Sequence, residues 1–99
     1  MRKGTTPKLF FDLPFDTSVI SRVRVVFAHN NEPILKKEDK SCSFSGNRIT
    51  ISLTQEETFL FKCDTNYQVQ VRLRLKGGDV ISSDTMNLPV ERCLDKEVI

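Results

Sequence analysis

The stretch from Tyr67 to Val80 reads YQVQVRLRLKGGDV and carries the strongest secondary-structure signal in the chain. Its apolar residues alternate with polar ones, which is the period of a strand with one buried face and one solvated face. Gly77-Gly78 follows this alternation, and a glycine pair accepts the positive φ of a tight hairpin turn. The stretch therefore predicts a long strand, a hairpin and a return strand that begins at Val80.

Shorter segments with the same alternation lie on both sides of this hairpin. Strands are expected at residues 9–13, 22–28, 34–37, 41–44, 49–53 and 86–90. Turn residues recur every 8–12 residues or so, which is typical of an antiparallel sandwich of about seven strands. We therefore predict an all-β fold, with a small open barrel as the alternative architecture.

Thr54-Gln55-Glu56-Glu57 has the pattern of a capping box. The threonine hydroxyl accepts a hydrogen bond from the N–H of Glu57, and the Glu57 carboxylate reaches back to the N–H of Thr54. Turn residues follow at 63–66, so the helix is expected to be a two-turn crossover between strands. Phe59 or Phe61 is expected to enter the core from it.

The composition is that of an ordinary globular domain, with 38% hydrophobic and 28% charged residues among 99. We expect one domain over residues 1–99, with 1–6 and 92–99 as arms that are flexible or are ordered by a partner. The apolar run after Met1-Arg2-Lys3 is interrupted by Asp12 and Pro14, so no signal peptide is expected. No apolar stretch approaches the ~20 residues that span a membrane. Synthesis in a cytoplasm, without membrane contact, is the resulting expectation.

No group of residues has the pattern of an active site. The three cysteines, Cys42, Cys63 and Cys93, have neither CxxC spacing nor an even count, so neither a zinc site nor a disulfide framework is indicated. His29 is the only imidazole and lies in an expected turn, whereas nucleophilic catalysis requires a base beside the nucleophile. Gly77-Gly78 lacks the spacing of a phosphate loop. We predict that the protein is not an enzyme and uses no cofactor.

Leu9-Phe10-Phe11 lies in the first expected strand, which Pro7 assigns to the start or the edge of a sheet because proline has no N–H to donate. Unpaired backbone flanked by aromatic residues recruits other strands. The edge either pairs with a neighbouring protein or is protected by charge and rigidity. The residues that would protect it are Lys8, Asp12 and Pro14.

Arg72 and Arg74 lie on the solvated face of the long strand, with Lys76 beyond them. Lys36 or Lys37 joins this basic patch if the third strand pairs alongside. The patch is an ordinary solvated face, or it binds an acidic protein, or, least favoured, a nucleic-acid backbone. A net charge of +2 does not by itself favour nucleic acid. The interface candidates are thus Leu9, Phe10, Phe11, Arg72, Arg74 and Lys76.

The segment from Leu53 to Cys63, LTQEETFLFKC, resembles the one that leads immunoglobulin domains into their sixth strand. In those domains a tyrosine near this corner hydrogen-bonds back to the backbone. Phe61 has no hydroxyl for that bond, and the chain contains no tryptophan. The resemblance implies an immunoglobulin-like antiparallel β-sandwich with one short helical crossover.

A second resemblance covers most of the chain. The segments that carry it are LPFD at 13–16, VVFA at 25–28, GNRIT at 46–50, LTQEET at 53–58, SD at 83–84 and VERCL at 90–94. They resemble small proteins from the structural gene clusters of phages and prophages of Gram-positive bacteria. The chain is also similar in kind to the immunoglobulin-like N-terminal domain of phage baseplate proteins.

This resemblance implies a virion structural protein that is made in the host bacterial cytoplasm and binds other virion structural proteins in a head, neck, tail or baseplate. A homo-oligomer fits the same role. Two alternatives remain. A carbohydrate-binding or cell-surface-binding module would use Phe10 and Tyr67, and a small nucleic-acid-binding regulator would use Arg72, Arg74 and Lys76.

Overall fold

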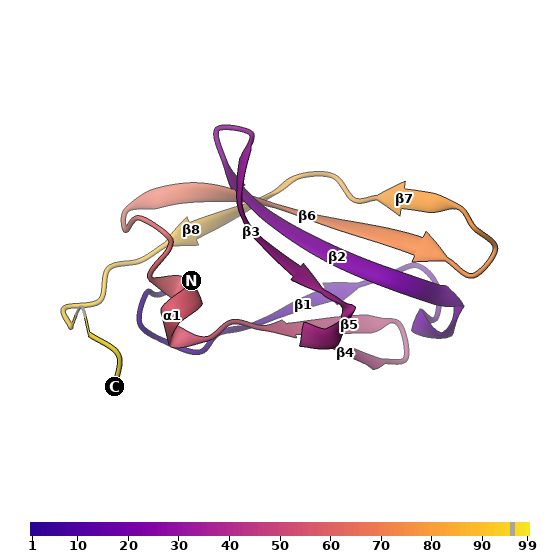
Figure 1. Ribbon diagram of the computed structural model, residues 1–99, viewed down its shortest axis with the longest axis horizontal. Helices are drawn as coiled ribbons and strands as arrows, with labels where there is room; N and C mark the ends of the chain where they lie inside the picture. The colour runs from indigo at the N-terminus through magenta and orange to yellow at the C-terminus, as the bar shows by residue number, and fades with distance from the viewer. Residues whose placement is uncertain (96) are drawn as a thin grey trace.

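The computed structural model describes residues 1–95 and 97–99. Within them, the alternating segments form eight strands in two antiparallel sheets (Figure 1). The strands are β1 (Lys8–Asp12), β2 (Ile20–His29), β3 (Glu32–Glu38), β4 (Cys42–Ser45), β5 (Arg48–Ser52), β6 (Thr65–Leu75), β7 (Val80–Ser82) and β8 (Met86–Val90). The helical elements are the 3-10 turns η1 (Thr17–Val19) and η2 (Asp39–Ser41) and the α-helix α1 (Gln55–Thr58).

One sheet has the order β1-β5-β4, and the other has the order β3-β2-β6, with β7 and β8 both pairing with the far side of β6. The predicted all-β antiparallel sandwich with one short helical crossover is confirmed, and α1 is the crossover between β5 and β6. The strand order corresponds to that of immunoglobulin domains when β1 is matched to their second strand, B. The sheet β1-β5-β4 then corresponds to B-E-D, and β3-β2-β6-β7 corresponds to C′-C-F-G, with β2 between β3 and β6.

The core consists of the inward residues of β2, β5, β6 and β8 together with Leu53, and it is closed by Phe61 from the crossover. Phe61 is 1% exposed and confirms the prediction that an aromatic residue enters the core there, whereas Phe59 is half-buried. The capping box is confirmed, with Glu57 N–H donating to Thr54 Oγ1 over 3.1 Å and Thr54 N–H to Glu57 Oε1 over 2.9 Å. The helix is one turn long, not two, because the chain bends at once to bring Phe61 between the sheets.

Tyr67 supplies the corner hydrogen bond that Phe61 cannot make. Its hydroxyl accepts from the N–H of Lys62 over 2.7 Å at the entrance to β6, which is the arrangement of a tyrosine corner. The ring is 3% exposed and packs edge-on against Phe61, with 4.8 Å between the ring centroids. Tyr67 is therefore a core residue and not a surface aromatic.

The first residues of the chain dock against the end of β8 and against Glu91, the residue that follows it. Glu91 N–H donates to Met1 O over 2.7 Å, and Lys3 N–H donates to Glu91 O over 3.1 Å. Gly4 N–H then donates to Thr58 Oγ1 over 2.9 Å. The expected arm over residues 1–6 is thus held against its own domain through residues 1–4, because its backbone finds partners on an edge strand.

The last residues of the chain contact α1. Ile99 N–H donates to Gln55 Oε1 over 2.8 Å, and Gln55 Nε2 donates to Ile99 O over 3.2 Å. Lys96, which belongs to the arm expected over 92–99, lies outside the described residues. No helix within the described ranges has the length and apolarity needed to cross a membrane.

Candidate protein-binding surfaces

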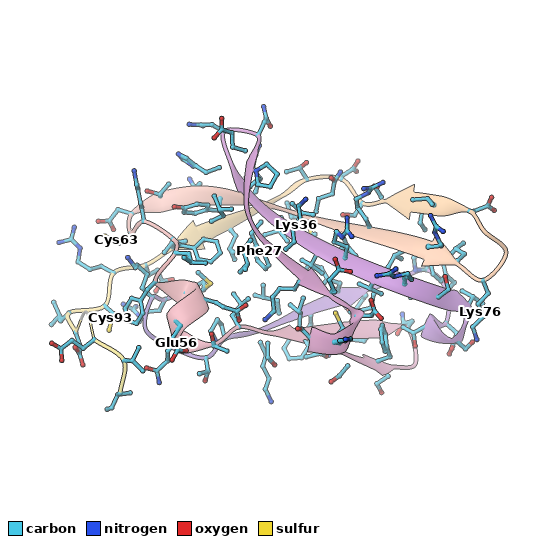
Figure 2. All side chains as sticks on the ribbon, in the orientation of Figure 1. Phe27, Lys36, Glu56, Cys63, Lys76 and Cys93 are labelled. Carbon is cyan, nitrogen blue, oxygen red and sulfur yellow. The ribbon has the colours of Figure 1, made fainter. Side chains whose placement is uncertain are left out.

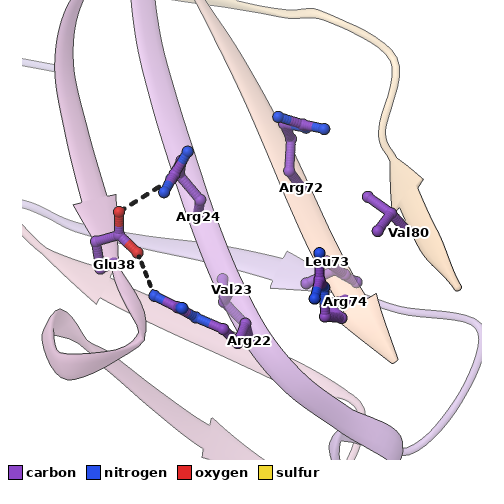
Figure 3. A pocket seen from close by; sticks show the side chains of 8 residues that line it. All are labelled: Arg22, Val23, Arg24, Glu38, Arg72, Leu73, Arg74 and Val80. Carbon is purple, nitrogen blue, oxygen red and sulfur yellow. Dashed lines mark hydrogen bonds and ion pairs between the residues drawn. The ribbon is translucent and has the colours of Figure 1, made fainter. Parts of the chain in front are cut away.

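Four arginines form one cluster on the outer face of the larger sheet, shown in Figure 3. In the register between β2 and β6, Arg22 lies directly opposite Arg74, and Arg24 lies directly opposite Arg72. The alternation of both strands explains this placement, because it sends Val23 and Leu73 into the core and the arginines outward. We call Arg22, Arg24, Arg72 and Arg74 the arginine face.

The two strands of the arginine face have different partners. Glu38 on β3 accepts from Arg24 Nε over 2.9 Å and from Arg22 Nη2 over 3.4 Å. On β6, Arg72 and Arg74 form no ion pair with any described residue. Like charges directly opposite each other in a sheet destabilise it by roughly 0.2–1 kcal/mol per pair. Glu38 offsets this repulsion on the β2 side alone.

The arginine face borders an open depression of about 220 Å³. The other residues that line it are Val23, Glu38, Leu73 and Val80. Val80, on β7, is 49% exposed and adds an apolar wall beside Arg74, its partner in the strand register. A planar guanidinium binds a carboxylate through two parallel hydrogen bonds. The depression therefore has the chemistry to receive acidic groups beside a small apolar contact.

The structure divides the predicted basic residues. Arg72 and Arg74 lie together as predicted, but Lys76 lies in the turn after β6, where its N–H donates to Val19 O over 2.9 Å, and it does not line the depression. Lys36, on β3, shares the outer face but lies opposite Val26 of β2. Figure 2 shows Lys36 well apart from Lys76. Lys37 points to the other side of the sheet, where it pairs with Glu57 of α1.

Arg22 and Arg24 are the members of the cluster that the sequence interpretation missed. The segment RVRV at 22–25 has the same alternation as RLRL at 72–75, and this alternation alone directs its two arginines outward. Their contribution depends on the pairing of β2 with β6, and the alternation of short strands does not determine which strands pair.

The three candidate residues of β1 also divide. Among the described residues β1 pairs with β5 alone, so it is an edge of the smaller sheet. Leu9 and Phe11 are half-buried against the core, whereas Phe10 is 56% exposed on the outer face. The guanidinium carbon of Arg48 lies 5.2 Å from the centroid of the Phe10 ring. Arg48 also donates from Nε to Asp12 Oδ1 over 2.8 Å, and this hydrogen bond lowers the pKa of the Asp12 carboxyl.

The remaining reactive side chains are dispersed. His29 lies beside Tyr67, with 5.1 Å between ring centroids, and its buried Nδ1 has no hydrogen-bond partner among the described residues. Burial raises the pKa of the Cys42 thiol, and Cys42, Cys63 and Cys93 are all free. In the described ranges, no three His, Cys, Asp or Glu side chains are grouped as metal ligands.

Comparison with protein-family models, with curated proteins and with solved structures found no match for this chain.

Proposed function

We propose that the protein is a non-catalytic structural protein of a phage virion, and that its arginine face binds an acidic surface of a neighbouring virion protein. The resemblance of its sequence segments to phage structural proteins supports the setting. The observation that carries the binding mechanism is the pair of directly opposed arginines, Arg22 with Arg74 and Arg24 with Arg72. Within the described chain, Arg22 and Arg24 form ion pairs with a carboxylate, whereas Arg72 and Arg74 do not.

In this mechanism the partner supplies carboxylates to the arginines of β6, as Glu38 supplies one to the arginines of β2. Glu38 holds Arg22 and Arg24 in place, and partner carboxylates bind the guanidinium groups of Arg72 and Arg74 through charge-assisted hydrogen bonds. Binding then relieves the cross-strand repulsion, and this relief is specific to the complex. Val80 adds an apolar contact, which a protein partner can use and a free anion cannot.

A protein partner fits the depression better than nucleic acid does. Glu38 and Asp39 border the arginine face, with Asp39 Oδ1 lying 3.9 Å from Arg22 Nε, and their charge repels a continuous phosphate backbone. None of the described residues that line the depression has an aromatic ring to stack on a base. The carbohydrate alternative loses Tyr67, which is buried, so Phe10 remains as its single candidate of the two.

The binding step is tested with an acidic synthetic peptide of alternating glutamate and serine, titrated into the purified protein at low salt. The double variant Arg72→Gln with Arg74→Gln is expected to weaken the affinity at least about ten-fold. The matched control, Lys36→Gln with Lys76→Gln, removes the same charge away from the depression and should keep most of the affinity. Equal losses in both variants would mean non-specific attraction and contradict the proposal.

A duplex DNA of similar length serves as the second probe. Binding of the DNA, but not of the peptide, through the arginine face would replace the proposal with the nucleic-acid alternative. The virion setting is tested separately, by probing purified particles from the producing bacterium with an antibody against the protein. The protein is expected in the particle fraction, and its restriction to the cell extract would refute the virion role.

A further inference from the structure

The backbone of β1 has a row of unused hydrogen-bonding groups. Leu53 N–H donates to Pro7 O over 3.0 Å, and Leu13 N–H donates to Asn47 O over 2.8 Å. In an antiparallel ladder, hydrogen-bonded pairs alternate with pairs whose N–H and C=O groups point away from each other. The odd residues of β1 therefore bond to β5, and the N–H and C=O groups of Lys8, Phe10 and Asp12 point out of the sheet edge.

The side chains of these same three residues share the outer face of the smaller sheet. Their order along the strand is basic, aromatic, acidic, and all three are exposed. This order reads as its own complement when a second copy runs antiparallel. Lys8 then faces Asp12 of the other copy on both sides of a central pair of Phe10 residues.

We propose that two copies of this chain associate through β1, antiparallel and centred on Phe10, so that their smaller sheets become one continuous sheet. Phe10 of one copy pairs with Phe10 of the other, and Lys8 pairs with Asp12 on either side. Each of these pairs exchanges two backbone hydrogen bonds. Every outward N–H and C=O of Lys8, Phe10 and Asp12 is then satisfied, and each charged side chain meets one of opposite sign.

Other registers satisfy fewer of the backbone hydrogen bonds and form fewer pairs of opposite charge. A shift of one residue would require the odd residues, which already bond to β5. A shift of two in one direction brings Pro14 into the ladder, where it has no N–H to donate. A shift of two in the other direction places Thr6 opposite Asp12 and leaves Lys8 opposite Phe10. Both shifts lose the charge pairs.

Asp12 has room for the second cation. Arg48 Nε donates to Oδ1 over 2.8 Å, whereas Oδ2 has only a 3.4 Å contact with Arg48 Nη2. A carboxylate accepts about four hydrogen bonds, so Lys8 of the second copy binds at Oδ2 without displacing Arg48. The two exposed Phe10 rings become neighbours across the seam and lose solvent contact. A single pair of short strands makes a small interface, so the association depends on protein concentration.

The test is a charge exchange followed by light scattering over a concentration series. Lys8→Glu leaves acidic groups at both positions of a strand, and Asp12→Lys leaves basic groups at both. Each variant alone is expected to be monomeric, with its dissociation constant raised at least about ten-fold. An equimolar mixture of the two restores both charge pairs and is expected to dimerise like the wild type. A wild-type monomer at every concentration overturns the proposal, as does a mixture that stays monomeric.

A backbone variant tests the ladder independently of charge. Phe10→Pro removes an outward N–H but no bond to β5, and proline is tolerated at that side of an edge strand. It is expected to abolish the dimer while the thermal unfolding transition stays cooperative. Arg72→Gln with Arg74→Gln should leave the dimer intact, so this proposal and the one for the arginine face fail separately. Loss of the dimer in that variant would assign it to the other sheet and overturn the β1 pairing.

Discussion

Lys37 and Glu57 form the least exposed ion pair of the described structure, with Lys37 Nζ 2.7 Å from both carboxylate oxygens. The side chains are 11% and 21% exposed. The pair joins β3 of the larger sheet to α1, the crossover to the other sheet. The same carboxylate accepts from the N–H of Thr54 in the capping box. One side chain thus fixes both the start of the helix and its position against a strand.

Replacing Glu57 with glutamine is expected to lower the free energy of unfolding by about 1–3 kcal/mol, because it leaves a half-buried lysine without its counter-ion. Glu56→Gln is the matched control. Glu56 is the exposed neighbour in the same helical turn, and its change should cost only the few tenths of a kcal/mol due to the helix dipole. Urea denaturation measures both, and equal costs would show that the ion pair contributes nothing.

The same pair predicts how stability depends on pH. Burial alone would raise the pKa of Glu57, but hydrogen bonds from Lys37 and from the N–H of Thr54 lower it below its ordinary value of 4.5. A lowered pKa in the folded state means stability that is fully present above the ordinary value and lost as pH falls through the folded one. The wild type should therefore lose more stability than Glu57→Gln during acid titration. Parallel curves for the two proteins would be evidence against this assignment.

The tyrosine corner is tested by Tyr67→Phe. This change keeps the ring in the core but removes the acceptor of the Lys62 N–H, which lies in a partly buried position. The expected loss is about 1–2 kcal/mol. For a domain of this size, that corresponds to a melting temperature lower by roughly 4–16 °C. A melting temperature within a degree of the wild type would mean that water replaces the hydroxyl at no cost.

The arginine face should lower the stability of the folded protein while it favours binding of the partner. Arg72→Gln removes a like-charge neighbour from Arg24 and should raise the free energy of unfolding by about 0.2–1 kcal/mol at low salt. Arg24→Gln also removes the ion pair with Glu38, so it should give a smaller gain or none. Added salt should shrink the difference between Arg72→Gln and wild type, because it screens exposed charges. A stabilisation that persists at high salt would have another cause.

The alternation of polar and apolar residues predicts the elements of this fold but leaves their pairing open. The hairpin after β6, the capping box at Thr54 and the outward direction of Arg72 follow from local patterns, because turns, caps and faces depend on neighbours in the chain. That β2 separates β3 from β6 depends on contacts between distant segments. The arginine face therefore emerges only with the register, since it joins two segments that are equally basic but far apart in sequence.

The role of Tyr67 could not be predicted from the sequence for a related reason. Immunoglobulin domains have the corner tyrosine near the start of their sixth strand, and Tyr67 has that position in β6, whereas the sequence resemblance matches Phe61 to it. The ring crosses back over Phe61 to reach Lys62. The alternation placed Tyr67 at the start of a strand without showing that its hydroxyl turns back to the preceding corner. Side-chain hydrogen bonds of this kind are visible only once the corner geometry is known.

The docking of residues 1–4 depends on Thr58, which is fully buried and accepts from the N–H of Gly4 over 2.9 Å. Thr58→Val keeps the shape of the side chain but leaves that N–H without a partner, so the first residues should detach more often from β8. Trypsin should then cleave after Arg2 and Lys3 several-fold faster, as followed by mass spectrometry. Thr6→Val is the control, because Thr6 is exposed and its hydroxyl has no hydrogen bond within the described residues. Equal cleavage rates in wild type and Thr58→Val would mean that the bonds to Glu91 hold this segment without the threonine.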